Sequence, residues 1–243
     1  MQGHTHALSG ALLWLGATPA VTALAGPLSN AEVAAGALAC AGAALLPDCD
    51  HPQGTIAHSV GPLSQAACKV IEVVSGGHRQ ATHSFLFTGV AFALSYGAAY
   101  RGNTQILSVL FFVLAAFALR ALTSNSAPRS REGGSRRSRP SPMSWGTSAA
   151  VAAGLTYLAA RSLETPWPWL APAVLIGVVA HLIGDALTPG GVPFFWPYRK
   201  KYAMPIVTHT GDVLEWALSG LMFVGVVFLA RDQFAGSFNV PFV

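Results

Sequence analysis

The sequence predicts an all-α, polytopic integral membrane protein of about seven transmembrane helices, with a metal site at the cytoplasmic ends of those helices. Composition carries the first half of this prediction. Hydrophobic residues fill 52% of the 243 positions and only 10% are Asp, Glu, Lys or Arg, whereas soluble domains carry about 25% charged residues. The apolar residues gather in stretches that approach the roughly 20 residues needed to cross a bilayer. The alternative left open by composition is a very apolar soluble helical protein.

Seven apolar segments can be read along the chain. Residues 1–243 are treated as a single membrane domain. The first segment contains Pro19, while the second and fifth are short and rich in Ala and Gly. Small residues suit close helix packing in a bilayer but are weak insertion signals, so six spans with one re-entrant segment is an alternative. The predicted segments are 7–26, 30–46, 84–100, 104–122, 146–161, 169–188 and 213–230.

An arginine-rich stretch sets the predicted topology. Residues 123–145 are rich in Ser, Gly and Pro and hold five arginines from Arg129 to Arg139, which predicts a disordered loop. Short basic loops between membrane helices are normally cytoplasmic. Counting outward from this loop places the N-terminus in the cytoplasm and the C-terminus outside. Because the basic residues are concentrated locally, the net charge of +4 does not indicate a nucleic-acid partner.

Histidines and carboxylates cluster at helix ends that this topology places on one side of the membrane. Random scatter would rarely bring these residue types to four or five helix ends on the same face, so we expect them to form one site. The clusters are His4 and His6; Asp48, Asp50 and His51; His78 and His83; His181 and Asp185; and Asp212 and Glu215.

His181 and Asp185 form the sharpest pair, because residues at i and i+4 of a helix share one face. Both side chains could reach a single metal ion, since Zn–N and Zn–O distances are about 2.0–2.2 Å. Ionisable residues within a membrane are costly and usually face a protein interior. The alternative is a His–Asp hydrogen bond that only ties helices together.

The remaining candidates extend this site. Pro47 cannot continue a helix, so Asp48 and Asp50 are free to bind a metal or to support a ligand from the following turn. His83 is positioned to point into the site. Arg79 could hold a phosphate bidentately or act as an ordinary interfacial anchor. The residues left without an assigned role are His4, His51, His58, His78, His209 and Asp212, and the cysteines Cys40, Cys49 and Cys68 lack a CxxC spacing.

Five motifs together resemble the YdjM-like family of predicted membrane-bound metal-dependent hydrolases. They are THALSG, LLPDCDHP, GHRQATHS, HLIGDALTPGGVPFFWP and TGDVLE, in that order. The resemblance spans residues 5–84 and 177–216, and residues 101–165 look like an insertion relative to the family. It implies a hydrolase of the bacterial inner membrane.

A more distant similarity links HLIGDALTP to the HxxxD metal segment of zinc-dependent phospholipase C and single-strand nucleases. This similarity implies zinc as the cofactor, with two or three ions. The metal ligands it implies are His6, His83, His181, Asp185 and a loop carboxylate, which is Asp48 or Asp50, with Asp48 preferred. The chain lacks the further histidine that follows HxxxD in those enzymes, reading Pro189-Gly190-Gly191 there instead, so two ions are the more economical expectation.

The favoured function is a divalent-metal-dependent hydrolase acting on a phosphoester of a lipid or lipid-linked substrate at the cytoplasmic face. In this hypothesis Asp50 or Glu215 is the general base and Arg79 binds substrate. A second hypothesis is a metal-binding membrane module or transporter without hydrolytic activity. A third is a structural membrane protein, which predicts separate local His–Asp pairs and no convergent site.

Overall fold

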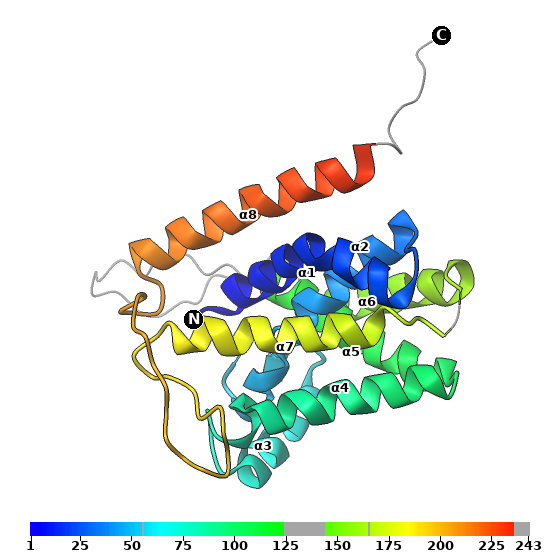
Figure 1. Cartoon of the computed structure of the whole chain (residues 1–243). Helices are drawn as coiled ribbons and strands as arrows, with labels where there is room; N and C mark the ends of the chain where they lie inside the picture. Colours follow the sequence, from blue (N-terminus) through cyan, green and yellow to red (C-terminus); the bar gives the residue numbers. More distant parts are fainter. Residues whose placement is uncertain (55, 124–143, 165, 236–243) are drawn as a thin grey trace.

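The chain folds into a bundle of α-helices joined by short 3₁₀ turns (Figure 1). The structure is a computed structural model that describes residues 1–54, 56–123, 144–164 and 166–235. Within these residues a single isolated β-bridge joins Val192 to Tyr202, and there is no β-strand. The α-helices are α1 (Gly3–Ala25), α2 (Asn30–Ala43), α3 (Pro62–Ser75), α4 (Phe85–Tyr100), α5 (Thr104–Thr123), α6 (Trp145–Ser162), α7 (Leu170–Ala186) and α8 (Val213–Phe234), and the 3₁₀ helices are η1 (Leu46–Asp50), η2 (Ile56–His58) and η3 (Ala81–His83).

The all-helical membrane architecture predicted from the sequence is confirmed. Each of the seven predicted apolar segments corresponds to one long helix, with α3 as an additional helix. Among the residues that the structure describes, four stretches are long and apolar enough to cross a membrane: α1, Asn30–Asp50, α5 and α8, while α4 and α7 are shorter apolar helices. The number of spans, six or seven, stays a prediction. The arginine run from Arg129 to Arg139 lies outside the described residues.

Helix α2 lies at the centre of the bundle, packed against α1, α5 and α7. Small residues make this possible. A Cβ added to Gly10 of α1 would lie 2.6 Å from the carbonyl oxygen of Cys40, and one added to Gly177 of α7 would lie 2.5 Å from the same oxygen. In α2 itself, a Cβ added to Gly42 would collide with the carbonyl oxygen of Leu114 in α5. Small residues on both sides of these contacts therefore allow the helices to approach closely.

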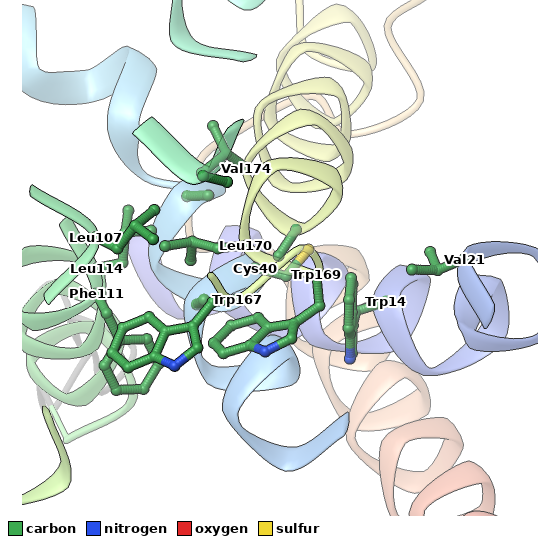
Figure 2. Packing of buried hydrophobic residues seen from close by; sticks show 14 of the residues in the cluster. Trp14, Val21, Cys40, Leu107, Phe111, Leu114, Trp167, Trp169, Leu170 and Val174 are labelled. Atoms are coloured by element: carbon green, nitrogen blue, oxygen red, sulfur yellow. The ribbon is translucent and has the colours of Figure 1, made fainter. Parts of the chain in front are cut away.

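The largest apolar cluster surrounds the first half of α7 (Figure 2). Trp167 and Trp169 stack with their ring centroids 5.8 Å apart, and Phe111 of α5 presents its edge to both. Trp14 of α1 is fully buried, and its indole N–H donates to the carbonyl oxygen of Val33 over 2.9 Å. This core holds α1, α2, α5 and α7 together and so fixes where the far end of α7 lies.

The beginning of α1, the end of α7 and the beginning of α8 lie at the same end of the bundle (Figure 1). The α4 start joins them, because the backbone N–H of Phe85 donates to the carbonyl oxygen of Phe194 in the α7–α8 loop over 2.9 Å. Ser84 caps α4, accepting from the N–H of Phe87. The sequence prediction placed these helix ends on one face, and the structure brings them together.

Candidate metal centre

Four ligand atoms from three parts of the chain converge at that end of the bundle. They belong to Asp48 of η1, His83 of η3, and His181 and Asp185 of α7, and all lie within 4.8 Å of one another. His83, His181 and Asp185 are buried, whereas the Asp48 side chain is 22% exposed. The third sequence hypothesis predicted separate His–Asp pairs, but the described residues form one convergent group.

The distances between these atoms bracket the spacing of the ligand atoms in a tetrahedral metal site. Nε2 of His83 lies 3.1 Å from Nε2 of His181, 3.7 Å from Oδ1 of Asp48 and 3.4 Å from Oδ2 of Asp185. Nε2 of His181 lies 3.8 Å from the same Asp48 oxygen and 3.5 Å from the same Asp185 oxygen. An ion that holds four ligands tetrahedrally at about 2.0–2.2 Å places the ligand atoms roughly 3.3–3.6 Å apart. The donor set, two imidazoles and two carboxylates, is one that zinc accepts.

His181 is held in the orientation that a metal ligand needs. Its Nδ1 lies 2.8 Å from the carbonyl oxygen of Ala44 at the end of α2. A carbonyl oxygen can only accept, so Nδ1 carries the hydrogen and the neutral imidazole presents a lone pair on Nε2. Metal-binding histidines commonly donate their second ring nitrogen in this way.

His83 is oriented by a relay through Thr82 to Asp50. The Thr82 hydroxyl donates to Oδ2 of Asp50 over 2.5 Å, and its oxygen lies 3.0 Å from Nδ1 of His83. Because the Thr82 hydrogen is engaged by the carboxylate, Nδ1 of His83 is the donor to the Thr82 oxygen. Nε2 of His83 is thereby directed at the convergent group.

The electrostatics of His83 show that this group favours a cation. Burial alone would lower the pKa of His83. Hydrogen bonds from its ring to the carboxylates of Asp185, Asp48 and Asp50 outweigh burial and raise that pKa to about 10. The carboxylates that raise this pKa face Nε2 of His83 and favour positive charge at that position. A metal ion bound there supplies that charge in place of a proton.

Asp185 is the most heavily contacted carboxylate of the centre. Its Oδ2 lies 2.9 Å from Nη2 of Arg79, and its Oδ1 lies 3.1 Å from the Met1 amino group and 3.3 Å from Nε2 of His6. The His6 ring stacks on His181 with centroids 4.0 Å apart. His6 thus lies beside the four-atom group without being one of its members.

Two glycines of the HLIGDALTPGG motif make room for these neighbours. A Cβ on Gly184 would lie 3.1 Å from the His6 ring, and a Cβ on Gly190 would collide with Nη1 of Arg79. Nη1 of Arg79 also donates to the Thr188 hydroxyl over 3.1 Å. The motif therefore encodes space for His6 and Arg79 as well as two ligand side chains.

Asp50 lies behind the four-atom group and is fully buried. Its Oδ1 lies 2.7 Å from Nδ1 of His78, while Oδ2 also accepts from the backbone N–H of Arg79 over 3.0 Å. The His78 ring stacks on His51 at 4.6 Å. Asp48, Asp50, His78 and His83 form a second set able to hold a metal, but it shares Asp48 and His83 with the first.

Glu215 is not part of either set. It is buried at the start of α8, where its oxygens accept from the backbone N–H groups of Gln2 and Gly211 and from the Thr5 hydroxyl, at 2.5, 2.7 and 2.9 Å. These bonds tie α8 to the beginning of α1. A role for Glu215 as general base stays a prediction, and its recorded contacts are those of a helix-joining carboxylate.

The residues without a predicted role are now placed. His4 lies against Trp216 with the two rings tilted and their centroids 4.9 Å apart, and His58 lies 3.1 Å from the amide of Gln65. The backbone carbonyl of His209 accepts from the N–H of Asp212, and Asp212 caps α8. His78 was left without a role, although GGHRQATH places it five residues before a candidate ligand. Thr82 and the Ala44 carbonyl were missed, because a hydroxyl and a backbone oxygen give no sequence signal for orienting a metal ligand.

The fold and the site together define a polytopic helical membrane protein with a buried His/Asp group able to hold a metal ion. Comparison with known families then places the chain. The YdjM inner membrane protein family matches residues 1–240, and the chain belongs to that family. It is therefore an integral inner-membrane protein, as the sequence motifs predicted.

Two curated relatives are the inner membrane protein YdjM of Escherichia coli (strain K12) and that of Shigella flexneri. Each is 35% identical to this chain over 81 residues, a stretch that covers 31% of this chain and 41% of the relative. The aligned region thus spans less than half of either relative. No solved structure matches the chain.

Proposed function

We propose that the protein is a divalent-metal-dependent hydrolase of the inner membrane, acting on a phosphoester of a lipid or lipid-linked substrate. The observation that carries this proposal is the convergence of Asp48, His83, His181 and Asp185, whose ligand atoms all lie within 4.8 Å of one another. A catalytic zinc ion keeps three protein ligands and one open position, so His83, His181 and Asp185 would hold the ion and Asp48, the exposed member, would be the ligand that water replaces. The orientation of both histidines supports the same assignment, since each donates Nδ1–H to a neighbour and turns Nε2 toward the group.

The four-atom group is the proposed primary site, and zinc is the proposed ion. When bound, zinc supplies Lewis-acid polarisation of a phosphoryl group and a nucleophile from water at neutral pH. The second set, with Asp50 and His78, would hold a further ion only by giving up the hydrogen bond between those two residues. It also shares Asp48 and His83 with the first set, so the proposal rests on one ion at the four-atom group and gives no support for three.

Arg79 is the proposed phosphate-binding residue. Its guanidinium lies against Asp185 at the edge of the centre and is 18% exposed, so it has a route to solvent as well as to the ligand group. An Arg fork can donate two parallel hydrogen bonds to a phosphate. Substrate bound there would lie next to Asp48, the exposed member of the four.

Asp50 is proposed to act on the metal centre by orientation. Its two oxygens are occupied by His78, Thr82 and the Arg79 backbone, which suits a residue that positions His83 better than one that abstracts a proton. His78 donates Nδ1–H to Asp50, so its Nε2 is left as an acceptor on a side chain that is 35% exposed. That arrangement makes His78 the better-placed group for proton transfer.

The location of the centre favours hydrolysis over transport. A transporter needs ligands near the middle of the membrane with access from both sides, whereas this group is built from the last turns of α7, the turn after α2 and the segment before α4. The cytoplasmic placement of that end follows from the arginine loop and is part of the proposal.

The test is hydrolysis by purified, zinc-loaded protein in detergent, using bis(p-nitrophenyl) phosphate and defined phospholipids with product detection by mass spectrometry. We expect zinc-dependent turnover that His181→Ala abolishes and that Asp212→Ala, at the half-buried N-cap of α8, leaves unchanged. Zinc-dependent uptake into proteoliposomes by protein that hydrolyses none of these probes would instead establish the transporter alternative.

A further inference from the structure

Helix α3, which the sequence analysis did not predict, carries an exposed apolar face. Leu63, Val73 and Val74 are 74%, 79% and 80% exposed, and Val70 lies between them on the same side of the helix. The other side of α3 packs on the bundle, where Ser64, Cys68 and Ser75 are buried. Apolar residues at spacings of three, four and seven define one continuous face of a helix. In an inner-membrane protein such a helix is suited to lie in the plane of the membrane interface.

A pocket of about 500 Å³ opens between α3 and the turn that follows η1. This volume lies within the range of about 300–1,000 Å³ typical of small-molecule sites. The pocket is lined by His51, Pro52, Gln53, Lys69, Glu72 and Val73.

Opposite charges face this pocket without neutralising each other. Lys69 and Glu72 are neighbours on one side of α3 and both line the pocket, yet no ion pair joins them in the described part of the chain. A ligand with one negative and one positive group, a few ångströms apart, would satisfy both side chains.

The pocket adjoins the candidate metal centre. His51 lines the pocket and stacks on His78, with ring centroids 4.6 Å apart. His78 in turn lies 2.7 Å from Asp50, the carboxylate that orients His83. One pair of stacked imidazoles therefore separates the pocket from the residues that support the metal ligands.

We propose that α3 rests in the membrane interface and that the pocket beside it binds the head group of a zwitterionic phospholipid with a primary ammonium. Lys69 contacts the phosphate, and Glu72 accepts hydrogen bonds from the ammonium. A choline head group lacks N–H donors for Glu72, and a glycerol head group lacks the positive charge. The idea that this lipid is also the substrate rests on the proposed hydrolase function. The binding of its head group in the pocket does not.

The head-group assignment is tested by native mass spectrometry of the full-length protein in detergent, with equal amounts of phosphatidylethanolamine, phosphatidylcholine and phosphatidylglycerol. We expect phosphatidylethanolamine to be retained over the other two, and Glu72→Gln or Lys69→Gln to reduce its retention to the level of phosphatidylcholine. Lys201→Gln, an exposed basic position outside the pocket, is the matched control and should keep the preference. Equal retention of the three lipids by the wild type overturns the assignment.

The placement of α3 is tested separately by spin labelling in nanodiscs. The three native cysteines are buried, so a label can be attached at Val74→Cys on the apolar face or at Gln65→Cys on the polar side of the same helix. We expect the Val74 label to be accessible to oxygen and shielded from a water-soluble nickel complex, and the Gln65 label to show the reverse. Equal exposure of both labels to nickel contradicts an interfacial helix.

The lipid measurement also separates this proposal from the proposed function. His181→Ala removes a ligand of the candidate metal centre but no residue of the pocket, so that variant should keep the phosphatidylethanolamine preference while losing any hydrolysis. If the wild type binds the lipid selectively and hydrolyses nothing, the pocket stands and the hydrolase proposal fails. If hydrolysis occurs without selective binding, the reverse holds.

Discussion

The Thr82 hydroxyl donates a hydrogen bond to Oδ2 of Asp50 over 2.5 Å, and its oxygen accepts one from Nδ1 of His83 over 3.0 Å. One small side chain thus connects a fully buried carboxylate to a candidate metal ligand. The relay fixes which nitrogen of His83 faces the centre, and Oδ2 of Asp50 itself lies 3.5 Å from the same Nδ1.

Replacing Thr82 by Val should weaken metal binding without removing a ligand. Val keeps the shape of Thr but cannot accept from His83 or donate to Asp50, and loss of such a supporting contact typically costs about 10–100-fold in metal affinity. The measurement is zinc affinity by competition with a chelator. Thr82→Ser restores the hydroxyl and should recover most of the affinity; equal affinities for the Val and Ser variants would show that the relay has no such role.

Arg79 should govern substrate affinity through its forked guanidinium. If hydrolysis of a phosphoester probe is established, Arg79→Lys should raise KM by roughly 10–100-fold, the loss expected for a charge-assisted hydrogen bond of about 1.5–3 kcal/mol, because Lys cannot bind a phosphate bidentately. Steady-state kinetics measure this, with kcat affected less than KM.

Gly190→Ala offers an independent check on Arg79. Its Cβ would collide with Nη1 of Arg79, so this variant should raise KM in the same direction while every polar group of the site is retained. If KM rises in Arg79→Lys but is unchanged in Gly190→Ala, the guanidinium does not have to lie against Gly190 in order to bind substrate.

Close contact between α2 and α7 should limit what Gly177 tolerates. A Cβ there would lie 2.5 Å from the Cys40 carbonyl oxygen and 2.7 Å from Cβ of Ala43, so Gly177→Ala should destabilise the fold by about 1–3 kcal/mol, as overpacking usually does. The thermal unfolding midpoint in detergent measures the change. Gly97→Ala in α4 is the matched control, since no atom lies within 4 Å of its added Cβ. It should be neutral or stabilising by up to about 1 kcal/mol, and equal destabilisation of both variants would refute the packing argument.

The sequence predicted the helices correctly where a long apolar stretch marked them. Segments such as 104–122 and 213–230 correspond to α5 and α8 within a few residues. Helix α3 was missed because its apolar residues are too few to span a membrane; the spacing of Leu63, Val70 and Val74 was the signal that could have identified it. The Ala- and Gly-rich α2 gave a weak hydropathy signal because its small residues serve helix contact.

The candidate site was predictable in its ligand types but not in its division of roles. His181 and Asp185 share a helix face by spacing alone, and their approach to Asp48 and His83 followed from counting helices outward from one arginine loop. Sequence could not separate Asp48, which faces the centre, from Asp50, which lies behind it, because the two are a single residue apart on a 3₁₀ turn. Glu215 has the same chemistry as a ligand, and only the contacts made by its oxygens set it apart.

The central claim is that Asp48, His83, His181 and Asp185 hold a metal ion. Its most direct test is zinc content by inductively coupled plasma mass spectrometry on detergent-purified protein after zinc reconstitution. We expect at least one equivalent per chain in the wild type and in Asp212→Ala, and a loss of that equivalent in both His181→Ala and Asp185→Ala. A wild-type protein that retains no stoichiometric metal, or variants that retain as much as the wild type, would contradict the account.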